Sequence, residues 1–201
     1  MGRIVVLISG SGSNLIALAE ACASGTVPGQ IVLVAADRHC EGLVKAAGKG
    51  LETALIEPKT FADRDEWSAA LKARVEAAEP DLVVSAGFMR ILAPVFVDAF
   101  EGRLINLHPA LLPAFPGAHA VRDALAAGVT ETGTTVHFID RLVDHGPTIL
   151  QQAVPIEPSD DENSLHERIK AAEHRLLPRA CRLLLEGKIR LRGREVEVAD
   201  E

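Results

Sequence analysis

The sequence predicts an α/β fold in which a Rossmann-like, mostly parallel sheet has helices on both faces and an antiparallel addition near the C-terminus. Between residues 3 and 127, short β-branched runs alternate with longer helical patterns. This order is typical of parallel strands joined by right-handed crossovers. Hydrophobic residues make up 48% of the 201 residues, and aromatic residues only 3%. Such an aliphatic composition suits a sheet that is buried on both faces.

The alternating part of the chain contains strand and helix patterns that are separated by turn residues. Strands are expected at residues 3–8, 31–36, 53–56, 81–87 and 103–108. Helices are expected at residues 14–24, 42–49, 65–78, 94–100 and 118–127. Gly25, Gly50 and Gly128 directly follow three of these helices, as glycine commonly does at a helix end.

The pattern then changes. Two strand patterns follow each other at residues 133–140 and 148–156. The turn between them is short, which makes the two strands antiparallel. Ser159 and Glu162 have the spacing of a capping box, so a long helix is expected to begin there and to continue to Glu186. No repeat or linker interrupts the patterns, and one domain is expected.

Composition and charge exclude several classes of function. A net charge of −7 argues against a nucleic-acid partner, which would need a basic stripe. The one basic stretch, residues 188–194, is interpreted as a solvated strand pair. No run approaches 18 apolar residues and the first strand is too short for a signal peptide, so we expect a cytoplasmic protein without a membrane segment. Cys22, Cys40 and Cys181 lie far apart, and no His, Asp or Cys cluster has ligand spacing, so no disulfide framework and no metal is expected.

A glycine-rich loop at residues 9–14 joins the first strand to its helix. Gly10 and Gly12 fit a dinucleotide-binding fingerprint, but Leu15 occupies the position of its third glycine. Asp37, at the end of the second strand, would then act as the ribose-binding acid. A simpler phosphate cradle, made by backbone N–H groups at a helix N-terminus, also explains the loop. A tight turn without a ligand is the third alternative.

Polar side chains gather where the later strands end. Asn106 and His108 alternate in one strand pattern, which places both on the same side of the strand. Because ligands of open α/β sheets bind outside the carboxyl ends of parallel strands, we expect this pair near the glycine loop, near residues 87–92 and near the segment that offers Asp140, Asp144 and His145. A carboxylate beside an imidazole raises the pKa of the imidazole, and an amide can stabilise an oxyanion. These are the parts of an acyl-transfer site without a protein nucleophile.

Each of these residues also has a purely structural interpretation. His108 would be a satisfied histidine at a strand end, and Asp144 would form a turn ahead of Gly146. His137, in the middle of a strand pattern, is interpreted as a core histidine or a support for the site rather than as a general base.

Five segments of the chain together resemble the folate-dependent formyltransferase family. They are "LISGSGSNL", "GFMRIL", "NLHPALLPAFPGAHA", "GTTVHFID" and "VDHGPTILQQAVPI", in this order. The resemblance extends from Arg3 to about Gly187. Within the family, the short glycine-serine loop and the chain length resemble the enzymes that act on glycinamide ribonucleotide. Related tRNA formyltransferases and deformylases would need a further domain, so a single formyltransferase domain over residues 1–201 is expected.

The resemblance implies a reaction and a set of site residues. The reaction transfers a formyl group from 10-formyltetrahydrofolate to the amine of 5′-phosphoribosylglycinamide (GAR) in de novo purine biosynthesis, without a metal. By resemblance, the catalytic residues are Asn106, His108 and Asp144. GAR would contact Gly12, Ser13, Asn14 and Glu173. The folate would contact Arg64, Met89, Arg90, Ile91, Leu92, Asn106, Asp140 and Asp144.

The resemblance also implies details of the loop and of the protonation state. A cis peptide bond is expected between Leu112 and Pro113. Asp144 would keep the imidazole of His108 charged near neutral pH. The protein would be a monomer or a homodimer, with small molecules as its partners.

Three residues depart from the family pattern, and two other functions stay open. Lys170 occupies the position of an expected glutamine, Ala114 that of a lysine and His145 that of a glycine, which makes the detailed GAR contacts less certain. A hydrolase would use water in place of the amine. A nucleotide-binding module would use Asp37 and give His108 no role.

Overall fold

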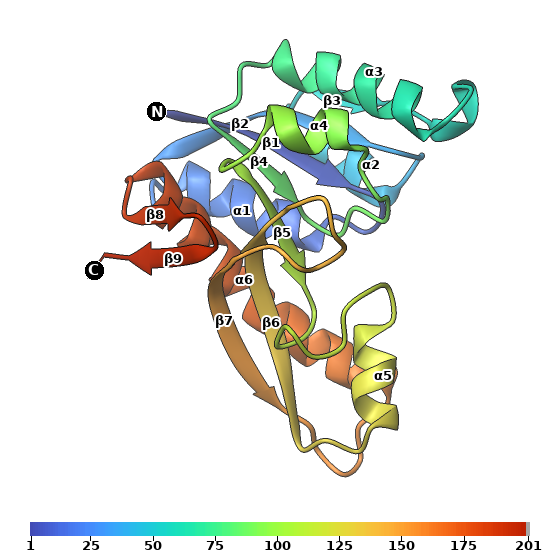
Figure 1. Ribbon diagram of the computed structural model, residues 1–201, viewed down its shortest axis with the longest axis vertical. Coiled ribbons are helices and arrows are strands. Elements are labelled where there is room, and N and C mark those ends of the chain that lie inside the picture. Colours follow the sequence, from blue (N-terminus) through green and yellow to red (C-terminus); the bar gives the residue numbers. More distant parts are fainter. Residues whose placement is uncertain (200–201) are drawn as a thin grey trace.

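The computed structural model describes residues 1–199 and is organised around one seven-stranded sheet (Figure 1). The strand order is β3-β2-β1-β4-β5-β6-β7. The strands are β1 (Gly2–Ile8), β2 (Gly29–Ala36), β3 (Thr53–Leu55), β4 (Leu82–Ser85), β5 (Leu104–His108), β6 (Glu131–Phe138) and β7 (Thr148–Pro155). Neighbouring strands are parallel from β3 to β5, whereas β6 and β7 pair antiparallel. The predicted mostly parallel sheet with an antiparallel addition is confirmed.

The helices are α1 (Ser13–Ala23), α2 (Glu41–Gly48), α3 (Arg64–Glu76), α4 (Pro94–Ala99), α5 (Ala120–Ala126) and α6 (Glu162–Leu185), with a 3₁₀ turn at Pro58–Thr60. Helices α1 to α4 lie in the connections between the parallel strands, α5 lies between β5 and β6, and α6 follows β7. After α6, β8 (Ile189–Arg192) and β9 (Glu195–Val198) form an antiparallel hairpin. A strand pair is present as expected, but residues 188–194 contain only its first strand and the turn. Across residues 1–199, none of the helices combines the length and the apolar character needed to cross a bilayer.

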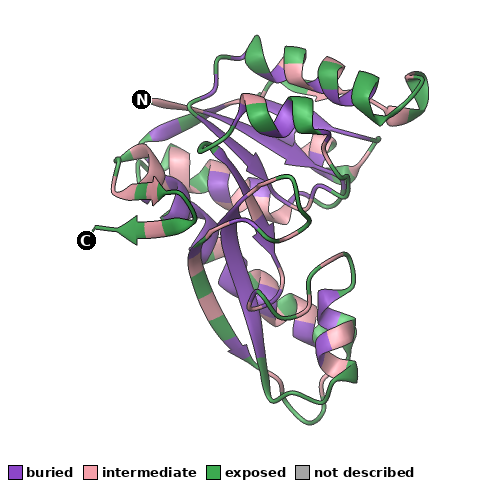
Figure 2. Ribbon diagram, in the orientation of Figure 1, coloured by how far each residue is buried: buried purple, intermediate pink, exposed green. Residues whose placement is uncertain are grey.

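The central strands are buried on both faces, as Figure 2 shows. Along β1, side chains alternate between two apolar clusters. Ile4, Val6 and Ile8 pack with residues of α1 and α6. Val5 and Leu7 pack with residues of α3 and α4 on the opposite face. The predicted placement of helices on both faces is therefore confirmed.

The N-terminus of α6 differs from the expected one. Asp161, and not Ser159, precedes the helix as its N-cap residue. Its carboxylate accepts a hydrogen bond from the Ser164 N–H (2.8 Å), and the Ser164 hydroxyl accepts one from the Asp161 N–H (3.0 Å). The capping box expected at Ser159 and Glu162 is therefore wrong, because Asp161 supplies a carboxylate acceptor directly at the helix start.

Two strands end two residues earlier than expected, and both ends lead into the candidate site. The strand expected at residues 81–87 spans only Leu82–Ser85. Gly87 has a φ of 76°, which takes the chain out of the sheet, and its carbonyl accepts a hydrogen bond from the Ser9 N–H (3.2 Å). Similarly, β6 ends at Phe138 rather than at residue 140. The residues that leave these strands belong to loops instead.

Candidate active site

The candidate site lies where the strand order of the sheet changes direction. β1 lies between β2 and β4, and ligands of open α/β sheets bind at such a point. Leu7, Ser85 and Asn106 form one row across β1, β4 and β5, so the loops that follow these strands leave the sheet at the same level. Four loops contribute to the site: residues 9–12, 86–93, 109–119 and 139–147. The first two are joined by the Ser9 hydroxyl, which accepts a hydrogen bond from the Met89 N–H (2.8 Å).

Asp144, in the loop between β6 and β7, contacts both Asn106 and His108. We call these three residues the contact group. Asp144 Oδ2 lies 3.3 Å from His108 Nδ1 and accepts a hydrogen bond from the Gly117 N–H (2.8 Å). Its Oδ1 accepts a hydrogen bond from the Asn106 amide (3.4 Å) and lies 3.6 Å from His137 Nε2. The structure thus brings together the three residues predicted to be catalytic, which come from two different elements.

His108 lies between two acceptors and is only 4% exposed. Its Nδ1 faces Asp144, and its Nε2 lies 2.8 Å from the Phe115 carbonyl. Burial lowers the pKa of His108 and outweighs Asp144 and the Phe115 carbonyl, both of which raise it. The net shift of this pKa is therefore downward, opposite to the direction expected from Asp144 alone. Asp144 acts in the expected direction, but the loss of hydration acts more strongly.

The carboxyl group of Asp144 is ionised at neutral pH. Burial raises its pKa, but hydrogen bonds from the His137 imidazole and the Gly117 N–H, together with His108, lower the pKa below its ordinary value. His137 is 2% exposed, and its Nδ1 lies 2.7 Å from the Phe138 carbonyl. Its Nε2 lies 3.2 Å from the Asn106 amide nitrogen. His137 is thus a buried neighbour of the site, as interpreted from the sequence.

The loop after β5 is held by side chains that the sequence analysis missed. The Thr135 hydroxyl donates to the Ala110 carbonyl (2.6 Å) and accepts from the Leu112 N–H (3.1 Å). The Gln151 amide donates to the Leu112 carbonyl (2.8 Å). The expected cis bond between Leu112 and Pro113 is present. Polar residues on the buried strand β6, in "GTTVHF", and on its neighbour β7, in "ILQQ", were the available signal for this network.

Gly146 allows the loop that carries Asp144 to pass close to β6. A Cβ at Gly146 would lie 1.7 Å from the Phe138 carbonyl oxygen. The Gly146→Ala variant should therefore be destabilised by about 2 kcal/mol or more, because the backbone itself must move. Urea unfolding measures this. Gly48→Ala is the matched control, since a Cβ there meets nothing within 4 Å and should change the free energy of unfolding by less than about 1 kcal/mol. Equal stability of both variants would contradict the close approach.

The glycine loop leads directly into the N-terminus of α1. Gly12 precedes the helix with a φ of 73°, a left-handed conformation that favours glycine. A Cβ at this position would lie 2.7 Å from the Gly42 Cα. The loop is also joined to α2 by the Gly42 N–H, which donates to the Gly10 carbonyl (3.0 Å). The first N–H groups of α1, beginning at Ser13, form a site that suits an anion.

Asn14 links this loop to the long helix α6. Its amide donates to Glu173 Oε2 (2.8 Å), and its own Oδ1 is buried without a hydrogen-bond partner. Glu173 is 5% exposed. Burial raises the pKa of Glu173 and outweighs the lowering by the Asn14 amide. The predicted GAR residues Gly12, Ser13, Asn14 and Glu173 thus lie together.

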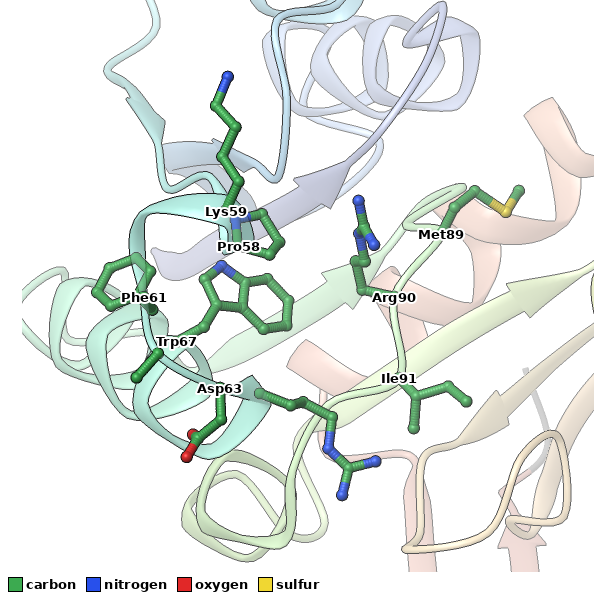
Figure 3. A pocket seen from close by; sticks show the side chains of 10 residues that line it. Pro58, Lys59, Phe61, Asp63, Trp67, Met89, Arg90 and Ile91 are labelled. Atoms are coloured by element: carbon green, nitrogen blue, oxygen red, sulfur yellow. The ribbon is translucent and has the colours of Figure 1, made fainter.

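A cavity of about 620 Å³ lies between α3 and the loop after β4 (Figure 3). Arg64, Met89, Arg90 and Ile91, four of the predicted folate residues, line it together with Trp67. Figure 3 shows the side chains of Arg90 and Ile91 on the strand-end loop, across the opening from the Trp67 ring.

The other predicted folate residues lie elsewhere. Leu92 packs against the apolar cluster on the α3 and α4 face. Asp140 lies near the start of the loop that carries Asp144, and its Oδ1 accepts a hydrogen bond from the Leu142 N–H (2.9 Å). Asn106 and Asp144 belong to the contact group around His108.

Asp37 is already paired within the protein. Its side chain has no exposed surface and forms ion pairs with Arg38 (2.9 Å) and Arg90 (2.7 Å). Burial raises the pKa of Asp37, but hydrogen bonds from Arg38, Ser9 and Arg90 lower it below the ordinary value. The carboxylate holds Arg90 in place, which argues against its use as the ribose-binding acid of a dinucleotide fingerprint.

Similar proteins identify the family of this chain. The formyl transferase family model matches residues 2–181. The chain belongs to the formyl transferase family. The phosphoribosylglycinamide formyltransferase of Mycobacterium tuberculosis (strain H37Rv) is 50% identical over 192 residues, which cover 96% of this chain and 89% of that protein. The Escherichia coli (strain K12) enzyme of the same name is 40% identical, with 94% and 90% covered. The crystal structure of glycinamide ribonucleotide transformylase 1 from Symbiobacterium toebii has a TM-score of 0.97 at 45% identity, and the match covers 100% of this chain and 95% of that chain.

Three residues depart from the expected formyltransferase pattern, and the structure shows the surroundings of each. Lys170 Nζ pairs with Glu167 on α6 at 2.6 Å. Ala114 is exposed in the loop after β5. His145 is exposed, and its Nδ1 lies 3.3 Å from Asp140. Within the described part of this formyltransferase, no group of three or more His, Cys, Asp or Glu side chains is placed to hold a metal ion.

Proposed function

We propose that this formyltransferase transfers a formyl group from 10-formyltetrahydrofolate to the amine of GAR in de novo purine biosynthesis. The observation that carries the proposal is the contact group of Asn106, His108 and Asp144 at the same edge of the sheet as the glycine loop. It combines hydrogen-bond donors with a carboxylate, and none of the three is a nucleophile of the Ser or Cys type. The names of the relatives support the same reaction.

The cavity and its surroundings fit a folate. Met89, Ile91 and Leu142 are 61%, 59% and 61% exposed, which provides apolar surface for flat rings. The Arg64 guanidinium, at the cavity wall, suits the carboxylates of the glutamate end. The proposed folate contacts are Arg64, Met89, Arg90, Ile91, Leu92, Asn106, Asp140 and Asp144.

The glycine loop and Glu173 fit a ribonucleotide. The N–H groups that follow Gly12, those of Ser13 and Asn14, are proposed to hold the phosphate. Glu173, a buried carboxyl group held by Asn14, is proposed to orient the GAR molecule. Lys170, one helical turn away, lowers the pKa of Glu173 and so favours its charged form.

The contact group would stabilise the negative charge that develops in the reaction and would transfer a proton. When bound, the folate supplies the formyl carbon and its leaving nitrogen. As the GAR amine bonds to that carbon, Asn106 and His108 donate hydrogen bonds to the formyl oxygen, where negative charge develops. Each such donor contributes about 3–4 kcal/mol. To bind this oxygen, His108 Nε2 must give up its hydrogen bond to the Phe115 carbonyl. The amine loses one proton and the leaving nitrogen gains one, which His108 can carry while Asp144 orients the ring.

An assay of formyl transfer tests the proposal. The protein is mixed with 10-formyltetrahydrofolate, with and without GAR, and the folate absorbance is followed. Tetrahydrofolate formed only in the presence of GAR is the expected result. Equal release without GAR would identify a hydrolase, and no turnover with either mixture would favour a binding module.

Asn14→Ala should raise the KM for GAR about five- to tenfold, because one hydrogen bond near a charged group is lost. The variant also releases Glu173, whose pKa should rise further. Initial rates at varied GAR concentration measure the effect, and the KM for the folate should stay unchanged. Ser24→Ala, at the far end of α1, is the control. A wild-type KM for GAR in the Asn14 variant would contradict the assigned contact.

The single-domain organisation over residues 1–201, the cytoplasmic location and the monomeric or homodimeric state stay predictions. One continuous sheet supports the first, since both the glycine loop and Asn106 belong to it.

A further inference from the structure

The loop that carries Asp144 is held from outside by the C-terminal hairpin. Arg194 lies in the turn between β8 and β9. Its Nη1 donates to Asp140 Oδ2 (3.0 Å), and its Nη2 donates to the His145 carbonyl and lies 3.0 Å from His145 Nδ1. One guanidinium therefore contacts both ends of the segment 140–145.

Asp140 connects this outer contact to the inside of the loop. Its Oδ2 binds Arg194, whereas its Oδ1 accepts the Leu142 N–H (2.9 Å). The loop is therefore held in a turn shape that includes Asp144 in a left-handed conformation, with a φ of 50°. An aspartate in this conformation needs support from its surroundings.

The hairpin is a suitable base for such a contact. Its apolar residues Ile189, Leu191 and Val196 pack against the apolar cluster between the sheet and the helices α1 and α6. A second exposed ion pair, between Arg141 of the loop and Asp98 of α4 (2.7 Å), connects the loop to α4. The loop is thus fixed to two separate parts of the fold.

We infer that Arg194 is a positioning residue, which holds the loop 139–147 so that the Asp144 carboxylate stays against His108. The inference rests on the proposed function only for the role given to Asp144. Arg194 acts through the loop and reaches no reacting atom. The 3.3 Å separation of His108 Nδ1 and Asp144 Oδ2 leaves little room for further displacement before the contact is lost.

Charged and titratable groups surround both His108 and Arg194. His108 faces Asp144 and His137, together with the Phe115 carbonyl. Arg194 faces Asp140 and the side chain of His145. The neighbouring Arg141 faces Asp98, with Glu101 nearby. Of the groups that face His108, Asp144 is the one that belongs to the loop 139–147, so a titration of His108 reports the position of this loop.

Titration of His108 by NMR tests the inference, because it needs no turnover. Histidine-labelled wild type, Arg194→Ala and Arg194→Lys are compared, with the His108 signal assigned from its absence in His108→Gln. We expect the pKa of His108 to fall in Arg194→Ala, because the raising effect of Asp144 weakens. In Arg194→Lys the pKa of His108 should fall less, since lysine keeps the charge but cannot form the bidentate contact. Arg192→Ala is the matched control, because Arg192 pairs with Glu197 within the same hairpin.

Kinetics add a second measurement. Arg194→Ala should raise the KM for 10-formyltetrahydrofolate about three- to tenfold, and its Tm should match that of the wild type, because exposed ion pairs contribute little to folding. An unchanged His108 titration together with an unchanged KM would overturn the inference. A shifted titration in a protein that shows no formyl transfer would support the positioning contact and reject the proposed function instead.

Discussion

Replacing His108 by alanine should lower kcat by about two orders of magnitude or more, with little loss of folded protein. The variant removes a donor aimed at the developing charge and the group proposed to carry the proton. The change also removes Nδ1, which faces Asp144 Oδ2. The Asp144 carboxylate then keeps only its contacts with Gly117, Asn106 and His137. Because these three contacts remain, the loop should keep its shape.

Single-turnover rates with saturating GAR and folate measure this effect directly. His39→Ala is the matched control, since His39 is exposed and lies outside the contact group. His108→Gln separates the two roles, because an amide can still donate a hydrogen bond but cannot exchange a proton near neutral pH. Near-normal turnover of His108→Ala, with urea unfolding unchanged, would remove His108 from the mechanism.

The parts of the fold that depend on local sequence were predictable. Alternating strand and helix patterns identified every strand of the sheet, because each apolar run is short and flanked by turn residues. The N-cap of α6 was not predictable in the same way. Asp161 and Ser159 both fit a helix start, and only the conformation of the chain decides which one accepts the Ser164 N–H.

The candidate site, like the fold, was predictable only in part. Asn106 and His108 were visible because they alternate in one strand pattern, whereas the pairing with Asp144 needed the family resemblance. The Phe115 carbonyl and the Gly117 N–H could not be found, since backbone groups have no letter in the sequence. The net effect on the pKa of His108 was also hidden, because burial depends on the packing of the whole loop.

Replacing Asp144 by asparagine should move the high-pH limb of the kcat profile to lower pH by about one unit or more. Activity that needs a protonated His108 is lost as the pH rises through the pKa of this group. Asp144 raises that pKa against the stronger effect of burial. Without the charge, only the Phe115 carbonyl still raises it, so the imidazole loses its proton at a lower pH.

The choice of asparagine makes the measurement specific to charge. Its amide oxygen can still accept the Gly117 N–H, so the loop can keep its conformation. The folded-state pKa of Asp144 is lowered, so its charge stabilises the wild type above the ordinary carboxyl pKa, and this contribution is lost as the pH falls. Asp144→Asn should lack that acid-dependent loss in urea unfolding, whereas Asp123→Asn, an exposed control, should keep it. If kcat falls at every pH with no movement of the limb, Asp144 orients the imidazole without tuning its charge, and the electrostatic role assigned to it is wrong.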